Sequence, residues 1–174
     1  MIPDTQAEYI ARIKAFSTIF NALSYYKWLD NTLIFGSLAK QYATFKQTQE
    51  ISEQCSARDI DICVKVPQGS QLTSAMIRPL LSLSKEYYGA LDPFFLLRST
   101  NGFDSFGHAR IVDDLIVRNE YATGVVYAKR KRELLKAIKT DGVPLSEFLC
   151  MYWNPFIQNQ NSARKAASSL KAKN

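Results

Sequence analysis

The stretch that decides the fold is Arg58-Asp59-Ile60-Asp61-Ile62-Cys63-Val64-Lys65-Val66. Its isoleucines and valines alternate with polar or small residues, and alternation with a period of two is typical of a β-strand with one apolar face. The same period places Asp59 and Asp61 on the opposite face, with their Cα atoms roughly 6.5–7 Å apart. The stretch therefore predicts a strand that carries two neighbouring carboxylates.

A second motif lies upstream, where a short apolar run meets a glycine. Thr32-Leu33-Ile34-Phe35 predicts a buried strand that Gly36 ends, and a helix is expected after Ser37 as far as about Phe45. A glycine here lets the backbone approach a ligand closely, and the free amides at a helix start favour an anion. Ser37 adds a hydroxyl donor and Lys40 follows one turn later, so this segment predicts a phosphate cradle.

The two motifs together indicate one kind of chemistry. Two carboxylates on one strand face repel each other unless a cation lies beside them. Hard oxygen ligands of this type suit Mg²⁺, which binds through one or two carboxylates together with substrate phosphates, and Mn²⁺ is also possible. The sequence thus predicts a phosphate cradle followed by a metal-binding carboxylate pair in one α/β unit.

This order of motifs resembles the nucleotidyltransferase superfamily, which has the polymerase-beta-like fold. The matching residues are Phe35-Gly36-Ser37-Leu38-Ala39-Lys40 and Arg58-Asp59-Ile60-Asp61-Ile62. Small stand-alone members often have Gly-Ser-x-Ala-Arg-Gly and Ser-Asp-Ile-Asp. In this chain Lys40 stands in place of the arginine, Gln41 in place of the second glycine and Arg58 in place of the serine.

The resemblance implies an α+β fold with a small mixed central sheet flanked by helices and a helical C-terminal segment. It also implies Mg²⁺-dependent transfer of a nucleoside monophosphate from an NTP to an acceptor hydroxyl. Asp59 and Asp61 would hold the metal, while Gly36, Ser37 and Lys40 would hold the phosphates. A third carboxylate should lie on a later strand and act as metal ligand and base. Asp92 fits best, with Asp113 and Asp114 as the alternative.

The remaining patterns outline one domain. Thr5-Gln6-Ala7-Glu8 predicts a capping box that opens a helix to about Tyr25. The other expected elements are a helix over 72–88 with a kink or restart at Pro79, a strand over 92–97, a loop over 99–107, a helix or strand over 111–118, a short strand over 124–127, a helix over 129–139 and a helix from Pro144. Residues 1–157 are expected to form a single domain, with a core over 28–128 and C-terminal helices over 129–157, followed by a basic, mobile tail over 158–174.

The positive charge gathers in two segments. The chain has 174 residues with 22 Lys and Arg against 16 Asp and Glu, a net charge of +6. The first segment has one acid, Glu133, and five cations: Lys129, Arg130, Lys131, Arg132 and Lys136. The second is the tail from Asn161, which contains four cations and no acid. Basic segments favour a polyanion, so RNA, such as a tRNA end, is one expected acceptor. A protein hydroxyl is another, and a cationic aminoglycoside is disfavoured.

The composition and the first residues exclude other classes. No apolar run reaches the roughly 18–20 residues of a membrane span. Met1 to Glu8 lacks the basic and apolar regions of a secretory signal. The sequence therefore predicts a cytoplasmic protein that does not associate with a membrane. Three cysteines without a paired spacing indicate neither a disulfide framework nor a zinc site. The alternative function is a non-catalytic nucleic-acid-binding or partner-binding module on a degenerate nucleotidyltransferase fold.

Overall fold

The fold is known from a computed structural model that describes residues 5–26, 29–66, 74–87, 89–98, 104–112, 115–120 and 125–173. Its elements, in chain order, are α1 (Gln6–Leu23), the 3-10 turn η1 (Leu29–Asn31), β1 (Thr32–Phe35), α2 (Gly36–Thr48), β2 (Ile60–Val66), α3 (Ser74–Glu86), β3 (Leu91–Arg98), β4 (Asp104–Val112), β5 (Leu115–Glu120), α4 (Val125–Asp141), β6 (Val143–Pro144), α5 (Leu145–Phe148), the π-helical turn η2 (Leu149–Trp153) and α6 (Asn154–Lys173).

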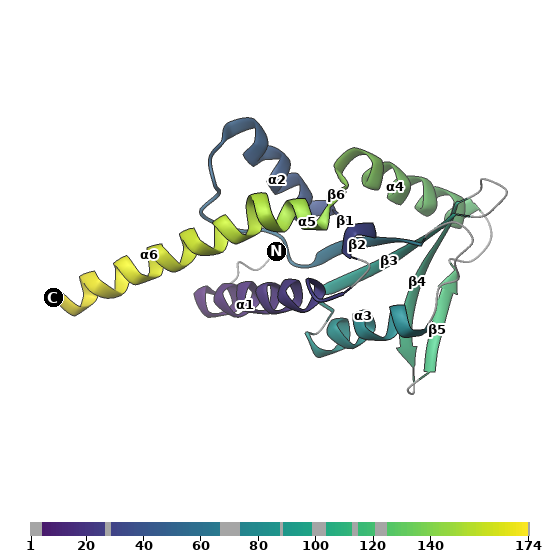
Figure 1. Ribbon diagram of the computed structural model, residues 1–174, viewed down its shortest axis with the longest axis horizontal. Helices are drawn as coiled ribbons and strands as arrows, with labels where there is room; N and C mark the ends of the chain where they lie inside the picture. Colours follow the sequence, from purple (N-terminus) through teal and green to yellow (C-terminus); the bar gives the residue numbers. More distant parts are fainter. Residues whose placement is uncertain are drawn as a thin grey trace.

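One mixed sheet organises these elements. Within the described residues it has six strands in the order β5-β4-β3-β2-β1-β6. β2 and β3 are parallel, and the other neighbours in the sheet are antiparallel. Helix α3 makes the crossover between the two parallel strands, which start at the same end of the sheet (Figure 1). The predicted α+β class with a mixed central sheet flanked by helices and a helical C-terminus is confirmed.

The two faces of the sheet are covered by different helices. Ile60, Ile62 and Val64 are buried against α1, α3 and the α5-η2-α6 segment in the main core. On the opposite face Cys63 packs in a smaller cluster with Ile138 of α4. Figure 1 shows α1 and α3 on one side of the sheet and α4 on the other. The alternation seen in the sequence thus separates a core face from the face that carries Asp59 and Asp61.

Local sequence explains where α1 begins and how it is held. Thr5 Oγ1 accepts a hydrogen bond from the Glu8 amide, and the Glu8 carboxylate accepts one from the Thr5 amide, which confirms the predicted capping box. The apolar face of α1 then packs on aromatic rings of α5, η2 and α6. The rings of Phe20 and Trp153, for example, meet edge to face with centroids 5.0 Å apart. This packing joins the two ends of the domain.

Several secondary-structure predictions need correction. The short strand expected over 124–127 is wrong, because residues 125–127 form the first turn of α4. Valine and tyrosine favour strands only where a sheet edge can receive them, and here the chain leaves the sheet after β5. The loop expected over 99–107 is wrong from Asp104 onward, because β4 pairs with both β3 and β5. Hydrogen bonding on both sides holds Gly107 in a strand despite its weak propensity.

Other predictions are settled in detail. Pro79 lies inside one continuous helix, α3, rather than at a restart. The ambiguous segment 111–118 is strand on both sides of residues 113–114, which lie outside the described residues together with Gly124. Residues 158–173, expected as a mobile tail, are helical and belong to α6. Gly142 ends α4, and β6 then adds a short strand before α5.

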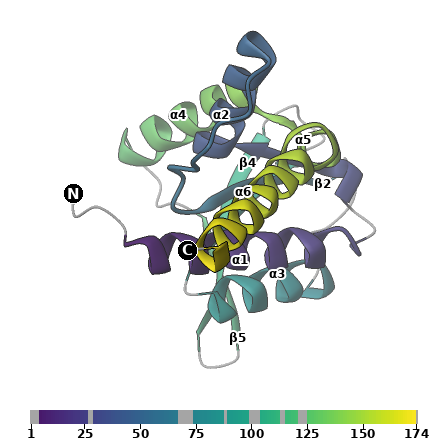
Figure 2. The same ribbon diagram turned by 90° about the vertical axis from the view of Figure 1, so that its left-hand side faces the viewer.

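Helix α6 projects from the body of the protein. Figures 1 and 2 show it extending away on the side where β2 and β3 begin, with its C-terminal end in front of α1 in Figure 2. Gln160 donates a hydrogen bond to the Glu53 carbonyl oxygen and so ties the first half of α6 to the loop before β2. Beyond Arg164 the described side chains of α6 are exposed.

None of the helices in the described part of the chain has the length and apolar character needed to span a membrane.

Candidate active site

Three carboxylates meet at the start of the two parallel strands. Asp59 directly precedes β2, Asp61 is its second residue and Asp92 is the second residue of β3. The register pairs Asp61 with Asp92 across the strands. One carboxylate oxygen from each residue can be chosen so that all three lie within 4.8 Å of one another, and all three side chains are half-buried. The predicted third acid Asp92 therefore joins the pair, while Asp113 and Asp114 lie outside the described residues.

Gly36 lies against this cluster for a steric reason. Its φ is +72°, a left-handed conformation that residues with a Cβ rarely adopt. Its neighbour Phe35 pairs with Asp61 across β1 and β2. A Cβ added at Gly36 would overlap Oδ2 of Asp61. Glycine is thus required twice here, and the carboxylate of Asp61 lies directly beside the backbone at the start of α2.

The start of α2 lies beside the same cluster at Gly36 and carries hydrogen-bond donors. Its N-cap is Phe35, which provides no side-chain cap, and its first turn contains no acid. Ser37 and Lys40 are exposed and, with Gln41 and Gln54, line a polar cavity of about 510 Å³. Uncapped amides, a hydroxyl and an ammonium group are the donors that bind phosphate at a helix start. Of the residues predicted as a phosphate cradle, Gly36 lies against Asp61, and Ser37 and Lys40 share one cavity wall at the start of the same helix.

The three carboxylates lie close enough together that they could hold a metal ion, and their proximity affects the protonation of Asp59. Burial raises the pKa of the Asp59 carboxyl, and the charge of Asp92 and a hydrogen bond between the two acids raise it further. A protonated Asp59 relieves this repulsion by losing its charge. A divalent cation would relieve it with all three acids ionised, which is the form that binds metal.

The raised pKa predicts a pH effect on the metal-free protein. The folded-state pKa of Asp59 lies above its ordinary value of 3.8. Between these two pKa values the folded state binds more protons than the unfolded state. The free energy of unfolding therefore falls as the pH rises through that window. We expect Asp59→Asn to raise the melting temperature in EDTA at neutral pH and to have no stabilising effect below pH 3.8. Melting curves from pH 3 to 7 measure this, and a less stable variant at neutral pH contradicts it.

No family model, curated protein or solved structure matches this chain.

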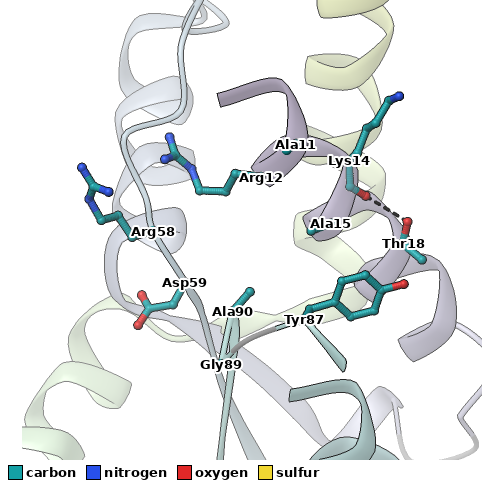
Figure 3. A pocket seen from close by; sticks show the side chains of 10 residues that line it. All are labelled: Ala11, Arg12, Lys14, Ala15, Thr18, Arg58, Asp59, Tyr87, Gly89 and Ala90. Atoms are coloured by element: carbon teal, nitrogen blue, oxygen red, sulfur yellow. Dashed lines mark hydrogen bonds between the residues drawn. The ribbon is translucent and has the colours of Figure 1, made fainter. Parts of the chain in front are cut away.

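The two departures from the expected motifs have places in the structure. Gln41 Nε2 donates hydrogen bonds to Tyr152 Oη and to the Gln54 carbonyl oxygen, so it ties α2 to η2 and to the following loop. Tyr152 is fully buried, and burial raises its pKa to about 12. Gln41 therefore serves the fold. Arg58 is exposed and, together with Asp59, lines a second cavity (Figure 3).

Sequence reasoning missed the wall of that second cavity. Arg12 and Lys14 of α1 line it together with Arg58. Arg12 is held in place, because its Nη2 donates to the Cys55 carbonyl oxygen at 3.2 Å and its guanidinium lies 5.6 Å from the centroid of the Tyr9 ring. No local pattern marks these residues, since the cavity forms only when α1 packs beside the start of β2.

The basic segment over 129–132 lies elsewhere. It belongs to the first half of α4, where Arg132 is exposed and the side chains of Lys129, Arg130 and Lys131 are outside those described. Figure 1 shows these first turns of α4 at the right-hand end of the sheet, whereas β2 and β3 start at the left. Of the two basic segments, α6 is the one that extends from the carboxylate end.

Proposed function

We propose that this protein is a metal-dependent nucleotidyltransferase that moves a nucleoside monophosphate from an NTP to an acceptor hydroxyl. The observation that carries the proposal is the cluster of Asp59, Asp61 and Asp92 directly beside the uncapped start of α2 at Gly36. The arrangement of β1 antiparallel to β2, and of β2 parallel to β3, also supports a polymerase-beta-like core. Carboxylates that lie beside hydrogen-bond donors able to bind phosphate suit a metal-bound triphosphate.

The residues present fit Mg²⁺ or Mn²⁺. Three half-buried carboxylates with oxygens within 4.8 Å provide the hard oxygen ligands that both ions prefer. Burial and the neighbouring charge of Asp92 raise the pKa of Asp59, and a cation beside these two acids would favour their ionised forms. Asp59, Asp61 and Asp92 would hold the metal. When bound, it would supply positive charge against the triphosphate and the leaving pyrophosphate.

The chain's own residues then have separate roles. The amides at the start of α2, with Ser37 and Lys40, bind the β- and γ-phosphates and hold the α-phosphate next to the carboxylates. Asp92, on β3, accepts the proton of the acceptor hydroxyl. The acceptor oxygen forms a bond to the α-phosphorus in line with the bond to the leaving oxygen. The bond between the α-phosphorus and the leaving oxygen breaks, and its electron pair leaves with pyrophosphate.

Label transfer tests the proposal. The full chain is incubated with each NTP labelled on the α-phosphate, Mg²⁺ or Mn²⁺, and either total RNA or cell protein. We expect label to enter one of these acceptors with release of an equal amount of pyrophosphate, and the double variant Asp59→Asn, Asp61→Asn to transfer none. A folded wild-type protein that releases no pyrophosphate with any NTP and acceptor contradicts the proposal and favours a non-catalytic binding module.

A further inference from the structure

The cavity that Asp59 lines has no role in the steps above. It has a volume of about 710 Å³ and lies between α1 and the residues that lead into β2 and β3. Ala90, which lines it, stands two residues before Asp92. The cavity beside Ser37 and Lys40 and this cavity beside α1 have no lining residue in common. If the first holds the triphosphate, an acceptor can reach the α-phosphate only from a different side.

The walls of this α1 cavity combine cations with apolar surface. Arg12, Lys14 and Arg58 line it against a single acid, Asp59. In the view of Figure 3 the guanidinium groups of Arg12 and Arg58 lie at the same end, above Asp59, and the ring of Tyr87 lies at the other. Three alanines, Ala11, Ala15 and Ala90, form the apolar part of the wall. Cations suit phosphate, and a small-residue wall with an aromatic ring suits a base.

Positive charge continues from this cavity onto α6. Arg12, which lines the cavity, donates to the Cys55 carbonyl oxygen. Gln160 of α6 donates to the Glu53 carbonyl oxygen in the same loop. This loop therefore places the first half of α6 near the Arg12 end of the α1 cavity, and Arg164 follows Gln160 by about one helical turn. Lys165 and Lys171 are exposed farther along α6, and residues 158–173 contain no acid. The cations form a path longer than one nucleotide, which suits a polyanionic strand.

Resting on the proposed function, we infer that the α1 cavity and α6 bind the acceptor and that the acceptor is the end of a single-stranded nucleic acid, taken here as RNA. Its terminal base lies against Tyr87 and the alanine wall, its phosphates lie on Arg58, Lys14 and α6, and its terminal hydroxyl faces Asp92. A protein hydroxyl needs no such row of cations, and a cationic small molecule is repelled by it.

RNA binding in the absence of chemistry tests the inference. Anisotropy of a labelled single-stranded RNA is measured with the full chain in EDTA between about 50 and 200 mM salt. The pocket variant is Lys14→Ala, Arg58→Ala, and the matched control is Arg78→Ala, Lys85→Ala, two exposed cations of α3 outside the cavity. We expect the pocket variant to bind the RNA more weakly. The slope of the logarithm of the binding constant against the logarithm of the salt concentration should become shallower by about 0.7 for each lost phosphate contact. The control should keep both values.

A kinetic readout links the cavity to the acceptor. In the transfer assay the pocket variant should raise KM for RNA and leave KM for the NTP unchanged, because the phosphate donors at α2 are intact. Circular dichroism and melting curves verify that both variants fold. Arg12 is left unchanged, since its bond to the Cys55 carbonyl oxygen supports the fold.

Each outcome separates this inference from the proposed function. If wild-type protein binds no RNA, or if the control variant loses as much slope as the pocket variant, the inference is wrong. Transfer of label to protein without RNA binding overturns the inference and leaves the proposed function standing. RNA binding that depends on Lys14 and Arg58 without release of pyrophosphate supports the binding site and overturns the proposed function together with the acceptor role.

Discussion

Asp61→Asn is expected to lower kcat for nucleotidyl transfer by at least about 10³-fold, equal to about 4 kcal/mol of transition-state stabilisation. Asp61 lies at the centre of the carboxylate cluster. It pairs with Asp92 on β3, and its Oδ2 lies where a Cβ at Gly36 of α2 would be. An amide keeps the shape of the side chain and removes a charge with which Asp61 would hold the proposed cation. Release of pyrophosphate measures the loss.

The same variant has a readout that needs no activity. Metal at about 100 times its dissociation constant should stabilise the wild-type protein by about 2.7 kcal/mol. For a chain of this size that corresponds to a rise in melting temperature of roughly 5–10 °C. Asp61→Asn should abolish this rise. The matched control is Asp30→Asn, which changes an exposed acid of η1 outside the cluster and should behave as wild type. An equal metal response in all three proteins would exclude a cation site at the carboxylates.

Gly36→Ala is expected to have the second large effect, on both stability and metal binding. An alanine at a φ of +72° costs about 1–2 kcal/mol through backbone strain alone. Its Cβ would also overlap Oδ2 of Asp61, so that carboxylate must move away from its partners. We expect a lower melting temperature and loss of the metal-induced rise. Melting curves with and without Mg²⁺ or Mn²⁺ measure both effects.

Gly89→Ala is the control that separates these two causes. Gly89 has a similar φ of +78°, but no atom lies within 4 Å of the position where its Cβ would be. The Gly89→Ala variant should therefore lose stability through backbone strain and keep its rise in melting temperature on addition of metal. If both alanine variants respond to metal as the wild type does, the close approach of Gly36 to Asp61 plays no part in the site.

The local patterns predicted the carboxylate pair well because a single strand defines it. The period of two across Ile60, Ile62 and Val64 places Asp59 and Asp61 on one face whatever the rest of the chain does. Gly36 was found in the same way, since a glycine between an apolar run and a helix is a local feature. The errors fell where neighbours decide the structure, as in residues 125–127, which become helix because the chain has left the sheet.

The sequence by itself determined which residues carry charge, which strand presents the two acids and where a phosphate can meet a helix start, because backbone geometry imposes those relations over a few residues. The family resemblance favoured Asp92 over Asp113 and Asp114, and the parallel register of β2 and β3 in the tertiary structure is what brings Asp92 beside Asp61. The tertiary structure also brought Arg12 of α1 beside Arg58. Contacts between distant segments follow from packing of the buried faces, and no local period encodes them.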